Sequence, residues 1–558
     1  MLKSAIIKCF PNNVKIIKHP YFLLFSILCI AFLIRTINLK DNILFGYDQA
    51  RDAQRVFDMV YKDHFKIVGP ETDIQGIFNG PLLYYMLAPV YYFSHFDPNA
   101  AALFFILINV GTIVLVYWTA KILFNKNSIA LIASLFWAFS FEQGFFARYI
   151  SNASSMSAMS TLFFVGLALF FLKKKQWGIP LSALGIALSI HSNFYFIYLF
   201  LFYPLFFVLF KKRPTGKTIA ASLVILVALL SPWIVTELKW KFVGTRSLFA
   251  YFDNQRATAS PTNLLLLFIS AVRHYYERVS QAIYFSFIPN KPIGFMILVS
   301  IMIYLLVKKR SQGIFLLLFW VLSTLPLFVF KSGVLGTEVI NGSVFIPITV
   351  LMAFGIVELA RIKIQKIPIV SILCVLGVVF YGFFSYVRNN FTTHSVHISE
   401  PSLLGNEKKV IDYTYAKANK KDFGICSISE PLFMNTVWSF LYSTYGKQKY
   451  GYLPYWTGQQ QTLNESFIPY AHKKYETKFI IQEPMFGIPK FVLRSTYYVE
   501  DSQNTLVEKK RFGEYVVQQR LFKKVDGGNT DSYSPSLKKS IHEDLSKIPQ
   551  LSCDNVYE

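Results

Sequence analysis

Long apolar segments separated by short polar connections dominate the first two thirds of the chain. Most of them are long enough to cross a bilayer as helices, and the shortest, 177–191 and 193–210, are joined by almost no loop. The eleven segments lie at about residues 20–38, 101–121, 127–146, 153–172, 177–191, 193–210, 217–235, 291–307, 311–330, 343–360 and 367–387. The pattern predicts a multi-pass α-helical membrane protein with about eleven transmembrane helices.

Basic residues gather at alternate connections between these segments. They lie before the first segment and in five later clusters: Lys121 and Lys126, Lys173 to Lys175, Lys211 to Arg213, Lys308 to Arg310, and Arg361 to Lys366. Because cytoplasmic loops carry the excess of lysine and arginine, the N-terminus is expected in the cytoplasm, with the first segment acting as an uncleaved signal anchor. The loops 39–100 and 236–290, and everything after about residue 390, are then extracytoplasmic.

Composition supports a location in a lipid bilayer. Lysine and arginine number 56 against 32 acidic residues, for a formal charge of +24, while 53% of the residues are hydrophobic. A nucleic-acid-binding protein can be this basic, but it does not carry apolar runs of membrane-spanning length. We therefore expect a multi-pass protein of the plasma membrane and no nucleic-acid partner.

The C-terminal part has a different pattern. Short helical and strand patterns alternate there, with helices expected at 408–418 and 432–445 and strands at 423–427, 478–482 and 515–521. This predicts a small extracytoplasmic α/β domain over 390–524, after a transmembrane domain over 1–389. The polar residues 525–558 are expected to be a disordered tail. Of the five cysteines, Cys426 and Cys553 could form one disulfide, but unpaired thiols are favoured.

The first extracytoplasmic loop, 39–100, is unusually acidic for so basic a protein. If 47–61 is helical, Ala50, Ala53, Val56, Phe57 and Val60 form one stripe, opposite a polar face with the residues Asp48, Arg51, Asp52 and Arg55. Asp48 and Asp52 then lie one above the other, a repulsive arrangement unless a cation joins them. The structural alternative is that both aspartates favour the helix N-terminus and pair with the two arginines.

The apolar segments are almost free of ionisable residues in their interiors. Ion-coupled transporters keep such groups at mid-membrane, so their scarcity argues against a pump or coupled transporter. Polar residues gather instead at the extracytoplasmic ends of the segments, where we expect them to line one cavity. A substrate that is half lipid and half anionic sugar phosphate suits such a place.

Four short motifs follow one another along the chain: Asp48-Gln49, GPLLYY (Gly80 to Tyr85), RYISN (Arg148 to Asn152) and SIHSN (Ser189 to Asn193). In their order and spacing, the chain resembles the GT-C glycosyltransferases over about residues 20–390. The branch is the one related to protein O-mannosyltransferases and the lipid A aminoarabinose transferase. Many members carry Asp-Glu where this chain has Asp48-Gln49, and Asp52 supplies a carboxylate one helical turn later.

The resemblance implies an extracytoplasmic, inverting transfer of a sugar from a polyprenyl-phosphate carrier to a lipid, glycan or protein acceptor. Such a transfer needs a base for the acceptor hydroxyl and cations for the departing phosphate. Asp48 is the candidate base, with Asp52 as its partner or as a second ligand for a divalent ion, Mg or Mn. Candidate phosphate-binding residues are Arg148, Arg246, Arg273 and Arg278, of which only the first has motif support.

The candidate residues for binding sugar or acceptor are Tyr84, Tyr85, Asn152 and His191. Each has a structural alternative: tyrosines form interfacial belts, outer arginines contact lipid headgroups, and a histidine at a tight turn is often a hydrogen-bonded structural residue. Three other functions share the layout. They are a polysaccharide polymerase, a flippase for lipid-linked sugars, and a non-catalytic receptor whose C-terminal domain is the active part.

Overall fold

The computed structural model describes residues 19–72, 74–258, 264–330, 337–362, 367–394, 401–458, 466–484 and 487–523. They form two compact units. The first is helical and comprises the described residues of 1–39, 59–90 and 100–396. The second comprises those of 40–58, 91–99 and 397–558. Part of the acidic loop over 39–100 therefore belongs to the same unit as the C-terminal sheet.

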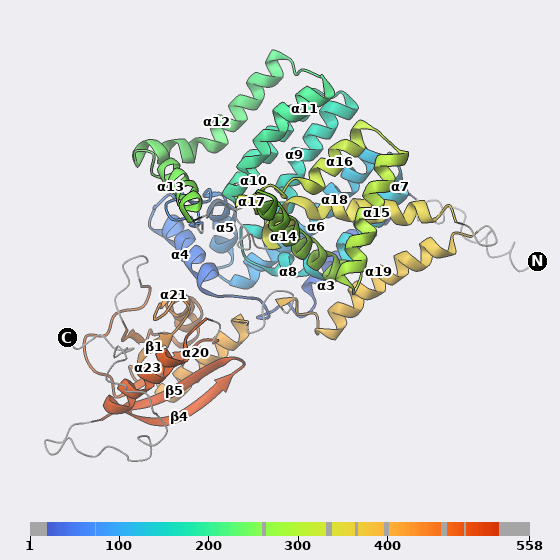
Figure 1. Ribbon diagram of the computed structural model, residues 1–558. Helices are drawn as coiled ribbons and strands as arrows, with labels where there is room; N and C mark the ends of the chain where they lie inside the picture. Colours follow the sequence, from blue (N-terminus) through green and yellow to red (C-terminus); the bar gives the residue numbers. More distant parts are fainter. Residues whose placement is uncertain are drawn as a thin grey trace, which may run out of the picture. The chain divides into compact units, whose positions relative to one another are not determined.

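Helices account for nearly all of the first unit (Figure 1). In chain order they are α3 (Pro20–Thr36), the end of α4 (Tyr47–Tyr61), α5 (Leu82–Phe93), α6 (Pro98–Phe124), α7 (Asn127–Phe139), α8 (Phe141–Arg148), α9 (Ala153–Lys173), α10 (Gly178–Ser192), the 3-10 helix η1 (Phe194–Leu201), α11 (Phe202–Phe210), α12 (Gly216–Lys239), α13 (Val243–Thr258), α14 (Leu264–Ser286), α15 (Lys291–Lys308), α16 (Gln312–Leu322), α17 (Leu327–Phe330), α18 (Thr337–Leu359) and α19 (Ile369–Arg388).

Each of the eleven apolar segments coincides with a helix or a pair of successive helices. Six helices of the described chain are long and apolar enough to cross a membrane: α6, α9, α12, α15, α18 and α19. The pair α7 and α8 makes a seventh if it is one bent span. The others, including α3, α10 and α16, are apolar but shorter. The helical class is thus confirmed, and the number eleven stays a prediction.

A buried arginine explains how the chain breaks between α7 and α8, which meet at an angle of 62°. The break leaves carbonyls at the end of α7 without helical partners. The fully buried Arg35 of α3 donates to two of them, Ala138 O at 2.8 Å and Trp137 O at 3.0 Å. On the other side of the break, Ser140 caps α8 by accepting from Gln143 N at 3.1 Å.

Polar side chains continue inward from Arg35. Its Nε donates to Asn109 of α6 at 3.0 Å, and the Asn109 amide donates to Gln143 of α8 at 3.3 Å. The Gln143 amide in turn donates to Asn341 of α18. Four helices are therefore joined by one buried hydrogen-bonded chain, which the apolar pattern of the sequence does not reveal.

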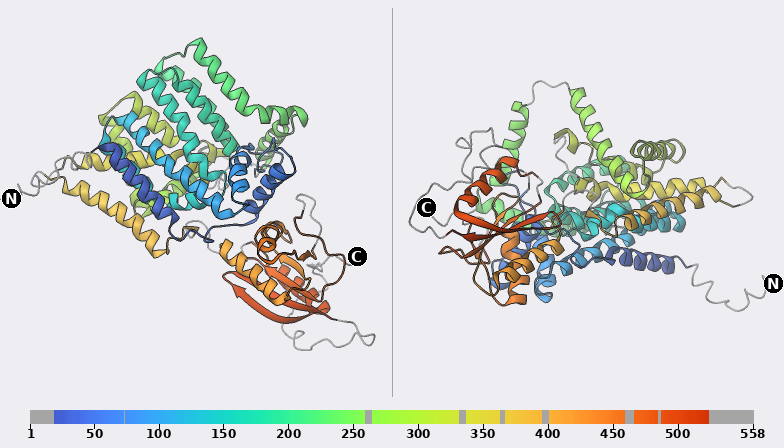
Figure 2. Two further views of the ribbon diagram at one scale, coloured as in Figure 1. Left: turned by 180° about the vertical axis from the view of Figure 1, so that it is seen from behind. Right: turned by 90° about the horizontal axis from the view of Figure 1, so that it is seen from below.

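The second unit contains a five-stranded sheet in the order β2-β1-β3-β5-β4. Its elements are α20 (Leu404–Ala418), β1 (Gly424–Ile428), α21 (Thr436–Leu441), the π-helical turn η3 (Tyr442–Gly446), α22 (Lys447–Tyr450), β2 (Tyr455–Trp456), β3 (Thr477–Gln482), α23 (Lys490–Gln503), β4 (Asn504–Phe512) and β5 (Tyr515–Phe522). The first three strands are parallel, and β5 is antiparallel to β3 and β4. Figure 2 shows helices on both sides of the sheet, and β1 is buried along its whole length.

The expected α/β domain is confirmed, together with β1, β3, β5 and the helix α20. The edge strand β4 was not predicted, because its sequence, NTLVEKKRF, is largely exposed and lacks regular apolar alternation. It pairs with β5 through a two-residue turn that begins at Gly513, whose positive φ of 58° suits glycine. Cys426 is disulfide-bonded, so the preference for unpaired thiols was wrong there. The expected disordered tail lies outside the described residues.

Two buried carboxyl groups make the stability of this unit depend on pH. Burial raises the pKa of Glu483 to about 7, although Trp438 Nε1 donates to it at 2.9 Å and Glu430 N at 3.2 Å. Burial also raises the pKa of Glu407, which accepts from Tyr515 Oη at 2.7 Å. Because both folded-state pKa values are raised, the protonated forms stabilise the fold and stability falls as pH rises.

For Glu483 alone, the free energy of unfolding of this unit should fall by about 3 kcal/mol as pH rises from the ordinary glutamate pKa to above about 7. Glu483→Gln, which imitates the protonated acid, should flatten this part of the dependence. Pulse proteolysis of the full-length protein between pH 5 and 8 measures it. Glu476→Gln is the matched control, because Glu476 is 75% exposed in its pair with Lys421. An unchanged slope in the Glu483 variant would contradict the assignment.

Candidate functional site

The acidic helix α4 begins with its first turn closed by a side chain. Gly46 N donates to the side chain of Gln49 at 3.0 Å, and Gly46 O accepts from Ala50 N at 3.0 Å. A glutamine at this position of a helix returns to the capping residue in just this way. The residue that replaces the second acidic position of the family motif therefore has a structural contact in this chain.

The two aspartates of α4 lie in different environments. The predicted apolar stripe is confirmed at Ala50, Ala53 and Val56, which are fully buried. Asp48 has a side chain that is 62% exposed, whereas the Asp52 side chain is only 7% exposed. The two carboxylates of the predicted polar face therefore differ in exposure, because packing inside the second unit covers more of α4 than its apolar stripe.

Arg51 is the cation that joins the two carboxylates. Its Nη1 donates to Asp48 Oδ1 at 2.8 Å, and its Nε and Nη2 donate to Asp52 Oδ1 at 3.0 and 2.9 Å. Its guanidinium also lies 5.7 Å from the centre of the Tyr47 ring. The repulsion expected between the aspartates is therefore offset within the helix.

These residues do not make a metal site as they stand. Among the described residues, no group of three or more histidine, cysteine, aspartate or glutamate side chains is placed to hold a metal ion. Asp48 and Asp52 supply two carboxylates, and Arg51 already bonds to both. A divalent ion would have to displace that arginine, so we route no chemical step through a metal.

The position of α4 is set by the C-terminal part of the second unit. Phe57 packs on Phe467 with ring centres 4.7 Å apart, and Phe45, just before the helix, packs on Phe440 at 5.5 Å. Gln54 Nε2 donates to Thr436 O at 3.2 Å. Contacts across nearly 400 residues of sequence therefore hold the acidic helix, and the C-terminal domain serves as its support.

The other predicted motifs meet in the first unit, at the turn that follows α10. Gly80 N donates to His191 O at 3.2 Å, and Phe194 N donates to the Asn79 side chain at 3.0 Å. The side-chain amide of Asn152 donates to Ser192 O. GPLLYY, RYISN and SIHSN are thus brought together by hydrogen bonds to backbone.

His191 is packed tightly in this cluster. Its Nε2 bonds to Leu229 O of α12 at 2.7 Å, and its ring lies 4.8 Å from that of Trp233. A methyl group added at Gly80 would lie 2.0 Å from His191 Nδ1 and 2.6 Å from Trp233. The glycine of GPLLYY is therefore required for close packing on the histidine.

Each of the three side-chain nitrogens of Arg148 donates to a backbone carbonyl. The side chain is almost fully buried, and its Nε donates to Arg35 O at 3.0 Å and its Nη2 to Ile37 O at 2.6 Å. Its Nη1 donates to Phe391 O, after α19. Arg148 thus joins the end of α3 to the chain that follows α19.

The remaining candidates are distributed over other helices. Arg246 is exposed on α13, while Arg273 and Arg278 are on α14, where Arg273 pairs with Glu277 at 3.0 Å. Tyr84 is buried, whereas Tyr85 is 43% exposed and donates to Lys66 O at 3.0 Å. The four candidate arginines therefore come from three different helices, α8, α13 and α14.

A cavity of about 390 Å³ adjoins the motif cluster at Trp233, whose ring packs on His191. It is lined mainly by apolar groups, including Phe78, Ile190, Trp233 and Trp240. Its polar edge includes Glu237, which accepts from Thr245 N and Oγ1 at 3.1 and 2.8 Å. The volume falls in the usual range for small-molecule sites, roughly 300 to 1,000 Å³.

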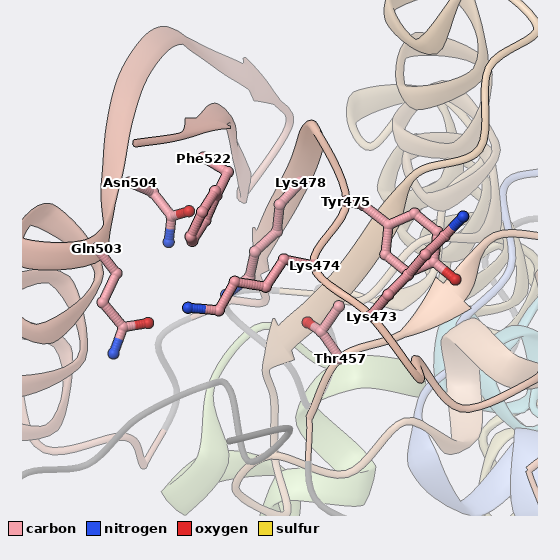
Figure 3. A pocket seen from close by; sticks show the side chains of 8 residues that line it. All are labelled: Thr457, Lys473, Lys474, Tyr475, Lys478, Gln503, Asn504 and Phe522. Atoms are coloured by element: carbon pink, nitrogen blue, oxygen red, sulfur yellow. The ribbon is translucent and has the colours of Figure 1, made fainter. Parts of the chain in front are cut away.

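The second unit has a much smaller pocket, of about 20 Å³, beside β3 (Figure 3). Three of its lining residues are lysines: Lys473, Lys474 and Lys478. The last of these is buried and bonded to both carboxylate oxygens of Glu500 at 2.8 and 2.9 Å. A space of this size holds about one water molecule, so a sugar does not fit there.

Comparisons with known proteins agree with the resemblance that the motifs indicate. The family model for dolichyl-phosphate-mannose-protein mannosyltransferase matches residues 79–236, a range that contains GPLLYY, RYISN, SIHSN and Trp233. Among solved structures, the crystal structure of ArnT from Cupriavidus metallidurans bound to undecaprenyl phosphate is similar to this chain. The TM-score is 0.53 at 11% sequence identity, and the match covers 89% of this chain and 97% of that one. No curated protein matches by sequence.

These two findings confirm the resemblance predicted from the motifs. The fold over most of the chain is similar to that of ArnT. The family match is confined to the part of the first unit in which the three motifs meet.

Gly80→Ala should lower stability, because its methyl group would overlap His191 Nδ1. Overpacking of this kind costs about 1 to 3 kcal/mol. Thermal unfolding of the full-length protein in detergent measures the loss, with Gly111→Ala as control, since a methyl group at Gly111 meets nothing within 4 Å. His191→Ala should restore part of the stability in the double variant. An equal loss of stability in Gly80→Ala and Gly111→Ala would refute the packing argument.

Proposed function

We propose that this protein is a membrane glycosyltransferase that moves a sugar from a polyprenyl-phosphate carrier to an acceptor on the extracytoplasmic face of the cell envelope. The observation that carries the proposal is the family match over 79–236, which falls on motifs that meet in space. The fold of most of the chain and the ligand of the similar structure, undecaprenyl phosphate, support it. In this proposal about eleven helices cross the membrane, with the N-terminus cytoplasmic and the α/β domain outside.

Asp48 is the proposed general base. It is the more exposed of the two aspartates, so an acceptor hydroxyl can approach it, and one of its oxygens is held by Arg51. Asp52 is buried and engages the other donors of Arg51, so we assign it the role of orienting that arginine. A base so placed would take the acceptor proton while the carrier phosphate leaves from the opposite face of the sugar, which inverts the anomeric centre.

For the departing phosphate, the geometry favours the exposed arginines over Arg148. Arg246, Arg273 and Arg278 lie on α13 and α14 with their side chains at least partly exposed, and so stay candidates. Arg148 bonds to three carbonyls, and releasing it would leave buried acceptors without partners. We assign Arg148 a positioning role, holding the chain that leads from α3 toward the acidic loop.

The cavity of about 390 Å³ supplies a place for the substrate beside the motif cluster. Its apolar wall suits the first prenyl units of the carrier, and Trp233 and Trp240 offer faces on which a sugar ring can stack. Tyr85 is the exposed tyrosine of GPLLYY and stays a candidate for sugar contact, whereas Tyr84 is buried. Asn152 and His191 shape this region through backbone contacts.

A polysaccharide polymerase working at the outer surface is the alternative that shares the most with this proposal, since it uses the same carrier. A receptor whose C-terminal domain is the active part is less favoured, because that domain supports α4 and its described pocket is too small for a sugar.

Asp48→Asn should lower transfer from a labelled polyprenyl-phosphate hexose to membrane acceptors by at least about 100-fold, the usual contribution of a general base. Expression and melting temperature should not change, because the Asp48 side chain is 62% exposed. Asp63→Asn is the matched control, an exposed aspartate beyond the end of α4. Unaltered turnover in the Asp48 variant would remove that residue from the mechanism.

Arg148→Lys separates the positioning role from phosphate binding. A lysine cannot reach three carbonyls at once, and each buried acceptor left unpaired costs about 1 to 3 kcal/mol. The melting temperature should therefore fall, while KM for the donor in the folded fraction stays the same. A raised KM at an unchanged melting temperature would show instead that Arg148 binds the phosphate. Arg246→Lys is the control for stability alone: Arg246 is exposed on α13, so its substitution should leave the melting temperature unchanged.

A further inference from the structure

The first unit contains a second and larger cavity, of about 860 Å³, that the proposed function does not use. It is lined by α15, α18 and α19, together with the turn that follows α14. Its walls are almost entirely apolar, and several small residues widen it, among them Ser300, Gly355, Cys374 and Gly377. It is a groove large enough for a flexible apolar chain rather than a gap between side chains.

The helices around this groove differ in burial. The apolar stretch of α18 is 94% buried, whereas those of α15 and α19 are only 17% and 22% buried. Helix α18 is therefore the floor of the groove, and the other two are walls whose outer sides are uncovered in this chain. A methyl group at Gly377 of α19 would meet nothing within 4 Å, so the groove is open at that point. In a bilayer such a surface faces lipid.

One end of the groove is charged. Glu358, at the end of α18, accepts from Lys309 at 2.9 Å and from Arg361 at 3.0 Å, and Tyr304 Oη also donates to it at 3.2 Å. Glu358 and Arg361 both line the groove. Two further cations, Lys308 and Arg310, are exposed at the end of α15.

We call the four cations at this end of the groove the basic rim: Lys308, Lys309, Arg310 and Arg361. Glu358 is the carboxylate that pairs with two of them. The ion pairs with Glu358 hold two of the four in place while leaving the Arg361 side chain 62% exposed. The rim keeps an excess of positive charge beside the opening of an apolar groove. An anionic headgroup with a long apolar chain is complementary to both parts at once.

We propose that this groove binds an anionic phospholipid, with its phosphate at the basic rim and one acyl chain lying along α18 between α15 and α19. By the distribution of basic residues this end is expected to be cytoplasmic, so the ligand comes from the inner leaflet. The carrier of the proposed reaction presents its phosphate at the opposite side. The site is thus a structural lipid site, independent of the transfer reaction, that completes the packing of two poorly covered helices.

The test measures retention of labelled phosphatidylglycerol by the immobilised full-length protein in detergent, in competition with unlabelled phosphatidylglycerol, phosphatidylcholine or a polyprenyl phosphate. Phosphatidylglycerol should compete about fivefold better than phosphatidylcholine, as one well-placed cation predicts. Arg361→Gln should remove about that factor, because it takes one cation from the rim and leaves Glu358 paired with Lys309. Gly377→Leu should reduce retention to background by filling the groove.

Two matched variants control for general effects. Gly111→Leu places the same side chain on α6, where a methyl group likewise meets nothing within 4 Å. Lys217→Gln removes an exposed cation from the start of α12. Both should retain the lipid as the original protein does. If Gly377→Leu melts at a lower temperature without lipid, lipid retention by Arg361→Gln alone tests the proposal. The Arg361 side chain is largely exposed, so its substitution should not disturb the fold.

Equal competition by the two phospholipids would overturn the proposal, as would full retention by the Gly377 and Arg361 variants. Stronger competition by the polyprenyl phosphate would overturn it as well and would assign the groove to the carrier. None of these readouts depends on sugar transfer, so a failure here is separable from a failure of the proposed function.

Discussion

Two buried arginines determine how the helices of the first unit end. Arg35 donates to the carbonyls at the end of α7, and Arg148, at the end of α8, donates to Arg35 O itself and to Ile37 O. A carbonyl left unpaired away from water costs free energy. Each arginine avoids that cost by donating hydrogen bonds to carbonyls at the end of a helix inside an apolar unit. The bend between α7 and α8, the exit of α3 and the turn after α19 all depend on this pair.

The polar residues of the three motifs in this unit act mainly on backbone. Asn152 donates to a carbonyl of the SIHSN turn, Gly80 allows His191 to approach, and His191 bonds to α12. These contacts fix the shape of the region around the turn after α10. The cavity beside them, bounded by Trp233 and Trp240, is the consequence of that shape.

The acidic helix α4 is held differently. Asp48 and Asp52 belong to the second unit, where Phe45, Gln54 and Phe57 connect the helix to residues near 440 and 467. The C-terminal domain thus has a clear structural task even without a catalytic motif of its own. A change of packing in that domain would move the carboxylates, and so the domain and the proposed chemistry are physically coupled.

Local patterns in the sequence determined the helical class, the positions of the apolar helices, the buried stripe of α4 and the strands β1, β3 and β5. All of these follow from periodicity and composition, which act over a few residues. Only the tertiary structure decided which partner each polar group finds: that Asp52 is buried against Arg51, that Arg148 serves carbonyls, and that the exposed strand β4 pairs with β5. The groove along α18 is also a tertiary result, because it exists only where three helices separated in sequence leave a space between them.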